Sequence, residues 1–262
     1  PSSDKMRAQS FRTGRSISAL MLREMSTTYG KSAGGYAWAI LEPVVAIAIL
    51  SMAFQLVFRQ PRLGNNFPFY FATGYLPYMI ALDIMNNTAR SIRFSRSLLA
   101  YPGVTWTDAI FARTLLSFVT DVGIMLIVMT AIFTIFSINT ILDFASIATA
   151  LAMAVGLAMG IGSLNCYLFT AIPPWERVWS AVTRPLVLLS GVIFLYDTMP
   201  PIAQNVVWWN PLLHVVGMAR RGFFPSYDAT YVSVPYVAGI ALVCGAFGFM
   251  LLHRHHKALL NA

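Results

Sequence analysis

The sequence predicts an all-helical integral membrane protein. Of its 262 residues, 57% are apolar and only 11% are charged, and the mean hydropathy is +0.65. A soluble domain usually has about a quarter of its residues charged. The apolar residues are also concentrated in long stretches that charges rarely interrupt. Together these observations exclude a soluble protein with a single core.

Six stretches are long and apolar enough to cross a bilayer as helices. At a rise of about 1.5 Å per residue, about 20 residues cover a hydrocarbon core of about 30 Å. The first three contain one acidic residue each, namely Glu42, Asp83 and Asp121. The fourth and sixth are uncharged, and the shorter fifth has Arg184 near its start. The predicted spans are 36–58, 67–87, 114–136, 144–172, 178–196 and 231–252.

The segment 198–224 is also largely apolar, but its prolines argue against a seventh crossing. Pro200, Pro201 and Pro211 leave only short uninterrupted pieces, each too short to span the hydrocarbon core as a helix. We therefore predict two short re-entrant or interfacial helices that enter and leave on one side. Such backbone is tolerated at membrane depth only where protein or water surrounds it, so this segment should line a cavity.

Lysine and arginine are distributed unequally between the two sides of these spans. Thirteen lie in the termini and in the loops 88–105 and 173–184, whereas four lie in the opposite loops. Because cytoplasmic loops carry the excess of basic residues, both termini are predicted to be cytoplasmic. Most of the net charge of +8 is therefore explained by topology, and we predict no nucleic-acid partner. The polar N-terminal segment leads us to expect no cleavable signal peptide.

The segment 11–30 has the periodicity of an amphipathic helix lying in the membrane interface. It is either a plain anchor or a lever beside a lipid-linked substrate. Arg15 and Arg23 are on the predicted cytoplasmic side, from which such a substrate enters. They are candidates to bind its phosphate or acidic sugars, with contact to anionic lipid as the alternative.

The segment 90–100 predicts a second short amphipathic helix on the cytoplasmic side. Its three arginines recur at every third position, opposite apolar residues. The pattern is explained either by the charge bias alone or by docking to a cytoplasmic partner. The residues concerned are Arg90, Arg93, Arg96, Leu98 and Leu99.

No arrangement of residues indicates an enzyme. The two cysteines are isolated in apolar stretches, and the histidine cluster 253–256 lies in a basic tail. The run Gly30-Lys31-Ser32 resembles the end of a phosphate-binding loop, but Met25 stands where that motif requires glycine. We therefore expect no metal site, no cofactor and no ATP site in this chain. Energy for any transport would come from another polypeptide.

Several short motifs are distributed along the chain. They are Leu22-Arg23-Glu24, Tyr29-Gly30-Lys31-Ser32, Gly35-Tyr36-Ala37-Trp38, Leu41-Glu42-Pro43, Pro185 with Ser190-Gly191-Val192, and Trp209-Asn210-Pro211-Leu212-Leu213-His214. These motifs resemble those of ABC-2 type permeases of polysaccharide exporters, and the resemblance covers essentially the whole chain. Within that family the chain looks most similar to capsular polysaccharide permeases of Gram-negative bacteria. One difference is Gly217, which stands where family members often have an acidic residue.

The resemblance implies a fold, a set of partners and a location. The fold would be the ABC-2 or type V exporter-like one, present as a homodimer in the bacterial inner membrane. Each subunit would bind a cytoplasmic ATPase subunit that holds ATP and Mg²⁺, with the 90–100 helix as the coupling element. An anionic glycolipid or polysaccharide would pass between the two permeases, in contact with membrane lipid and with a copolymerase that spans the periplasm.

Other functions remain open at this stage. The same fold would suit a permease for O-antigen, teichoic acid or a small molecule. A membrane enzyme acting on lipid-linked sugars is disfavoured because no acid, base or metal-binding groups converge. A passive scaffold would need no water-filled path.

A hydrophilic polymer needs a wet path with weak, repeated contacts, and aromatic faces suit sugars while arginine suits carboxylate or phosphate. Arg220 and Arg221 run against the charge bias, so we predict that they face the exit of the path or an outer partner, with interfacial anchoring as the alternative. The aromatic candidates line the path or belong to the aromatic belt of the membrane surface. These are Tyr70, Tyr75, Tyr78, Trp208, Trp209 and Tyr227.

Ionisable residues within membrane spans are costly and usually face the protein interior or a partner charge. Glu42, Asp83 and Asp121 are of this kind. The Glu42-Pro43 pair also stands where a kink would open the first span. We therefore predict a structural or gating role for Glu42 and Pro43.

Overall fold

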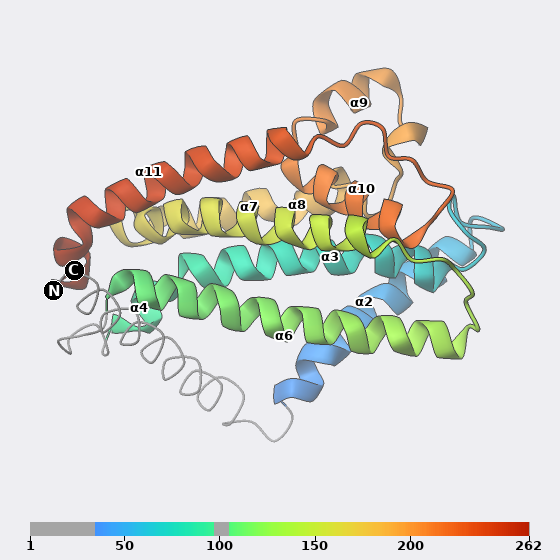
Figure 1. Ribbon diagram of the computed structural model, residues 1–262, viewed down its shortest axis with the longest axis horizontal. Helices are drawn as coiled ribbons and strands as arrows, with labels where there is room; N and C mark the ends of the chain where they lie inside the picture. The colour runs from blue at the N-terminus through green and yellow to red at the C-terminus, as the bar shows by residue number, and fades with distance from the viewer. Residues whose placement is uncertain (1–34, 97–104, 262) are drawn as a thin grey trace, which may run out of the picture.

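The computed structural model describes residues 35–96 and 105–261, and every regular element in these ranges is helical (Figure 1). The predicted interface helix 11–30, with Arg15 and Arg23, lies outside the described residues, as do Leu98 and Leu99. In chain order the helices are α2 (Gly35–Gln55), α3 (Phe67–Ala89), α4 (Ser91–Phe94), α6 (Trp106–Ile135), α7 (Phe144–Ala171), α8 (Pro174–Leu189), the 3₁₀ helix η1 (Tyr196–Thr198), α9 (Pro201–Val207), α10 (Pro211–Phe223) and α11 (Val234–Asn261).

Helix α3 lies at the centre of the bundle. It packs against α2, α6, α7 and α10, and most of its side chains are buried. The longest helices, α6, α7 and α11, run along the long axis of the molecule, whereas α2 crosses at an angle (Figure 1). Helices α6 and α7 pack against α3, and α11 packs on α7. Because α3 is enclosed by protein, its polar residues, such as Thr73 and Thr88, need not face lipid.

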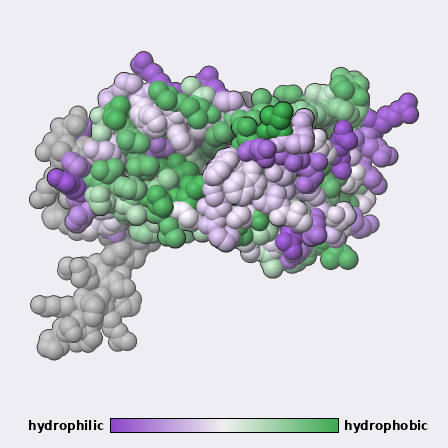
Figure 2. Space-filling view, turned by 90° about the horizontal axis from the view of Figure 1, so that it is seen from above, coloured by the Kyte–Doolittle hydropathy of each residue, from purple (hydrophilic) through white to green (hydrophobic). Residues whose placement is uncertain are grey.

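The described part of the chain contains four helices that are long and apolar enough to cross a membrane: α2 from Ala37, α6, α7, and α11 as far as His255. Large apolar side chains on these helices are exposed, including Trp38, Met52 and Leu242. Figure 2 shows broad apolar areas beside hydrophilic residues that gather toward the right-hand end. A lipid-facing surface explains this exposure. The six-span topology itself stays a prediction.

The fifth predicted span, 178–196, differs from the helix that the structure contains. Helix α8 ends at Leu189, and Gly191 adopts a left-handed conformation with φ of 73° that turns the chain away from the helix axis. Its 16 residues extend about 24 Å, short of a hydrocarbon core of about 30 Å. The backbone then stays irregular until η1 begins.

The proline-rich segment forms α9 and α10, and both helices begin at a proline, where the missing N–H costs nothing. Asn210 precedes α10 and accepts the N–H of Leu212 through its side-chain oxygen. Its amide nitrogen donates to Ser190 Oγ at 2.9 Å and to the Leu189 carbonyl at 3.1 Å. One side chain thus caps α10 and ties it to the end of α8. The re-entrant placement of this segment stays a prediction.

Candidate functional site

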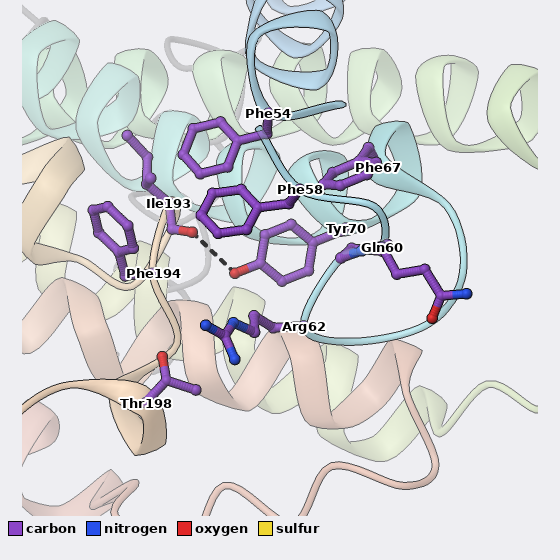
Figure 3. Close-up of a pocket in the computed structure, with 10 residues that line it drawn as sticks. Phe54, Phe58, Gln60, Arg62, Phe67, Tyr70, Ile193, Phe194 and Thr198 are labelled. Atoms are coloured by element: carbon purple, nitrogen blue, oxygen red, sulfur yellow. Dashed lines mark hydrogen bonds between the residues drawn. The ribbon is translucent and has the colours of Figure 1, made fainter. Parts of the chain in front are cut away.

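A pocket of about 130 Å³ lies where the end of α2, the start of α3 and the irregular segment after α8 meet (Figure 3). Its walls are aromatic: the Phe54 and Phe58 rings are 5.7 Å apart, and Phe194 lies 6.3 Å from Phe54. Tyr70 forms part of the wall and donates its hydroxyl to the Ile193 carbonyl at 3.0 Å. Of the residues predicted to line the substrate path, Tyr70 is one that lines this pocket.

Arg220 lies behind the same tyrosine and is almost completely buried, with 1% of its surface exposed. Its guanidinium carbon is 4.3 Å from the centre of the Tyr70 ring. The two terminal nitrogens donate to the carbonyls of Gly191 at 2.6 Å and Val192 at 2.8 Å. A longer contact of 3.5 Å reaches the Tyr70 carbonyl.

Arg220 is thus buried within the subunit, while its predicted place at the exit of the path or against an outer partner stays a prediction. The end of α8 leaves carbonyl groups without helical partners, and buried carbonyls need donors. Arg220 supplies these donors from α10, so its charge faces the interior. Gly74 makes room for it, because a Cβ at that position would lie 2.6 Å from Arg220 Nη2. Sequence reasoning missed this cluster because its members are far apart in the chain.

Arg221, the next residue, is exposed and lies on the other side of α10. It is close enough to Asp143 to help lower the pKa of that carboxyl group. The larger cause is Ser146, whose hydroxyl and backbone N–H both donate to Asp143. Asp143 thereby caps α7. The predicted role of Arg221 at an exit or an outer partner stays a prediction.

The remaining aromatic candidates do not share one pocket within the subunit. Tyr78 is buried with its hydroxyl 3.4 Å from the Thr183 carbonyl, and Tyr227 is buried with its hydroxyl 3.3 Å from that of Tyr231. Tyr75 is half-buried beside the core. Tyr78 therefore ties α3 to α8, whereas Tyr227 binds within the connection between α10 and α11.

Trp208 and Trp209 precede α10 and differ in exposure. Trp208 is half-buried and donates its indole N–H to the Tyr231 carbonyl at 3.2 Å. Trp209 has 66% of its surface exposed and borders an apolar pocket of about 290 Å³ with Trp179 and Leu186. Trp209 is thus the more accessible of the two, and its predicted path role is untested.

His214 belongs to the motif that suggested the family, and it joins α10 to the start of α11. It is fully buried, and Nδ1 accepts the Ser233 N–H at 3.2 Å. Nε2 lies 2.9 Å from the Trp208 carbonyl, so this nitrogen carries the proton. Three residues later, a Cβ on Gly217 would collide with the Tyr231 hydroxyl. The acidic residue common in the resembling family would not fit here without moving Tyr231.

Glu42, Asp83 and Asp121 come from α2, α3 and α6, and all three line one pocket of about 190 Å³. Pro43 lines the same pocket from within α2. Asp121 Oδ2 is buried without a hydrogen-bond partner. In the described ranges, no group of three acidic, histidine or cysteine residues could hold a metal ion. The tertiary structure thus joins three residues that the sequence offers only separately, while the gating role of Glu42 and Pro43 stays a prediction.

The arginines of the 90–100 segment bind within the subunit. Arg90 Nε and Arg93 Nη1 pair with the two carboxylate oxygens of Glu176 at 3.0 and 2.8 Å. Arg93 also donates to the Phe169 carbonyl near the end of α7 at 2.8 Å. Arg96 is exposed at the end of the described segment. Sequence analysis did not single out Glu176, which lies in the first turn of α8.

The Arg93 guanidinium, helped by that of Arg90, holds the pKa of Glu176 below its ordinary value of 4.5, although burial acts in the opposite direction. Helix α4 is therefore attached to α8 and α7 through one acidic side chain and one carbonyl.

The family model for the ABC-2 type transporter matches residues 15–224. The chain belongs to the ABC-2 type transporter family. It is 29% identical over 246 residues to the polysialic acid transport protein KpsM of Escherichia coli, covering 94% of this chain and 95% of that protein. It is 29% identical to the capsule polysaccharide export inner-membrane protein CtrC of Neisseria meningitidis serogroup A, covering 94% and 92%. Identity to the capsule export protein BexB of Haemophilus influenzae is 27%, covering 94% and 93%.

Membership of the ABC-2 family agrees with the predicted family and with a transport subunit that is not an enzyme. It also implies an ATPase partner, because ABC-2 permeases are the membrane subunits of ABC transporters. The all-helical architecture with several apolar helices is that of a multi-pass membrane protein.

We expect Arg220→Gln to destabilise this ABC-2 permease by at least about 2 kcal/mol, because the Gly191 and Val192 carbonyls would lose their donors in a buried site. Gly74→Ala should act in the same direction by displacing the guanidinium. Thermal unfolding of the purified protein in detergent, followed by tryptophan fluorescence, measures both. Arg221→Gln is the matched control and should change stability by less than about 0.5 kcal/mol. Equal effects of the two arginine variants would contradict the buried role of Arg220.

We expect Glu176→Gln to loosen α4, seen as faster hydrogen exchange of the amides of residues 91–94. Because both ion pairs are partly exposed, the loss of stability should be only about 1 kcal/mol or less. The pKa of Glu176 is lowered in the folded protein, so the contribution is present above about pH 4.5 and is lost as the pH falls below that value. The difference in exchange between the variant and the wild type should therefore shrink at acidic pH. A difference that persists unchanged at low pH would contradict the ion-pair explanation.

Proposed function

We propose that this chain is the permease subunit of an ATP-driven exporter that moves lipid-linked capsular polysaccharide across the bacterial inner membrane through a path between two copies. The observation that carries this proposal is the nearly end-to-end match with three proteins named for polysialic acid transport or capsule polysaccharide export. In each match about 94% of this chain is aligned. A shared fold segment alone would not give this coverage.

The packing of the bundle supports a path between two subunits. Helix α3 fills the centre of the subunit, so a polymer passing through the middle would have to displace it. Exposed apolar side chains on α2 and α8, such as Val45 and Leu188, offer surface for a second copy.

The cytoplasmic junction supports coupling to a separate ATPase. In the proposed topology both termini and α4 lie in the cytoplasm, with two ATPase copies, each holding ATP and Mg²⁺, below the permease dimer. The pairing of Arg90 and Arg93 with Glu176 would carry movement of α4 into α8. A copolymerase spanning the periplasm would receive the anionic polymer on the outer side.

Co-expression of the chain with the proteins encoded beside its gene tests this function. We expect an ATPase to co-purify in equal amount with the permease, and its ATP hydrolysis to depend on the permease. Chemical cross-linking in the membrane should give a permease dimer. The polymer accumulating inside cells that lack the permease should be capsular. Accumulation of O-antigen or teichoic acid would mean that this polymer, and not capsular polysaccharide, is the substrate. Absence of a co-purifying ATPase would contradict an ABC exporter.

A further inference from the structure

We propose that the aromatic pocket of Figure 3 is a binding subsite for one acidic sugar ring, with Arg62 as the residue that selects the carboxylate. This inference rests on the proposed function and names the substrate class at this site. It adds a residue that the motifs do not single out.

The pocket is small and opens at the surface of the subunit. Its volume of about 130 Å³ is slightly below that of a cavity of about 150 Å³ that holds a benzene molecule, so a sugar ring would place one face against the aromatic wall and leave its other atoms outside. A folded polymer segment would not fit. Phe58 and Phe194 are both exposed at the pocket, so their ring faces are accessible without any rearrangement. The apolar face of a sugar ring would contact these surfaces.

Among the polar side chains that line the pocket, Arg62 is the cation that is available to bind a ligand. The Tyr70 hydroxyl is used by the Ile193 carbonyl, and the Thr198 hydroxyl donates to the Leu195 carbonyl at 2.9 Å. Arg62 is exposed, and within residues 35–96 and 105–261 it forms neither a hydrogen bond nor an ion pair. In Figure 3 its side chain lies beside Tyr70 and reaches toward the segment that carries Thr198.

The chemistry of guanidinium selects the ligand class. Arginine binds a carboxylate through two parallel N–H···O bonds, which fixes orientation as well as charge. An aromatic wall with one guanidinium at its mouth therefore favours a ring that has an apolar face and an acidic substituent. A neutral sugar would use the wall alone and bind more weakly. Arg220 cannot serve this purpose, because it is buried and its two terminal nitrogens already donate to backbone carbonyls.

The pocket also has a suitable position for a transient contact. It is formed by the end of α2 and by the irregular segment that Arg220 holds in place. On the predicted topology, Arg62 belongs to an outer loop. Each acidic sugar of a polymer leaving the membrane would contact this subsite once. Because the pocket is small and open, each sugar ring would bind weakly and dissociate before the next one arrives.

The test uses the full-length chain in nanodiscs of uncharged phosphatidylcholine. The probes are tetragalacturonate, with a carboxylate on every ring, and neutral maltotetraose. We expect Arg62→Gln to weaken tetragalacturonate binding about tenfold, and to leave maltotetraose binding unchanged. Arg62→Lys should give an intermediate loss, because lysine keeps the charge without the planar fork.

Arg59→Gln is the matched control, since Arg59 is exposed in the same loop but does not line the pocket. If Arg59→Gln and Arg62→Gln weaken tetragalacturonate binding equally, the effect comes from the total positive charge of this loop and not from the pocket. That result would overturn the proposal. Equal loss of both probes in Arg62→Gln would overturn selection of the carboxylate. If phosphatidylglycerol in the nanodisc abolishes the difference between wild type and Arg62→Gln, the guanidinium binds lipid headgroups, which also overturns the proposal.

The two proposals fail independently. Export of polymer by a complex that contains an ATPase, with Arg62→Gln showing normal binding of tetragalacturonate, would remove the subsite and leave the exporter intact. Selective binding of tetragalacturonate by a chain that recruits no ATPase would remove the exporter and leave the subsite.

Discussion

The burial of one guanidinium among backbone carbonyls determines how the rest of this bundle is arranged. Helix α8 ends early, and the carbonyls beyond it lie inside the protein, where no water replaces their helical partners. Arg220 supplies the missing donors from α10, and the ring of Tyr70 on α3 covers its charge. Three elements distant in the chain are therefore fixed by one side chain, and the aromatic pocket lies on the other side of that ring.

Helix α8 is bound by arginine at its start and just beyond its end, and between these points Trp179 donates to Asn86 and the Thr183 carbonyl accepts from Tyr78. At its start, Glu176 binds Arg90 and Arg93, and beyond its end Arg220 binds the carbonyls of the irregular segment. Many side chains along the helix are exposed. Helix α8 therefore lies between the Arg90–Glu176–Arg93 junction and the segment that lines the aromatic pocket.

The accuracy of the sequence-based reading depended on whether a feature was local. Long apolar stretches indicated α2, α6, α7 and α11, because exposure of apolar side chains to lipid leaves a continuous signal. The end of α8 left no such signal, since the residues after Leu189 are as apolar as those before it. The motifs around Ser190 and Asn210 were noticed separately, and the structure brings them into contact through one hydrogen bond.

The sequence alone determined the membrane class, the absence of a phosphate-binding loop from the chain, and the family, because composition and short motifs are properties of neighbouring residues. The tertiary structure decided which charged residues face inward. It buried Arg220, left Arg221 exposed, and joined Glu42, Asp83 and Asp121 in one pocket. The physical reason is that the cost of burying a charge depends on partners supplied by other helices, and one-dimensional patterns do not contain those partners.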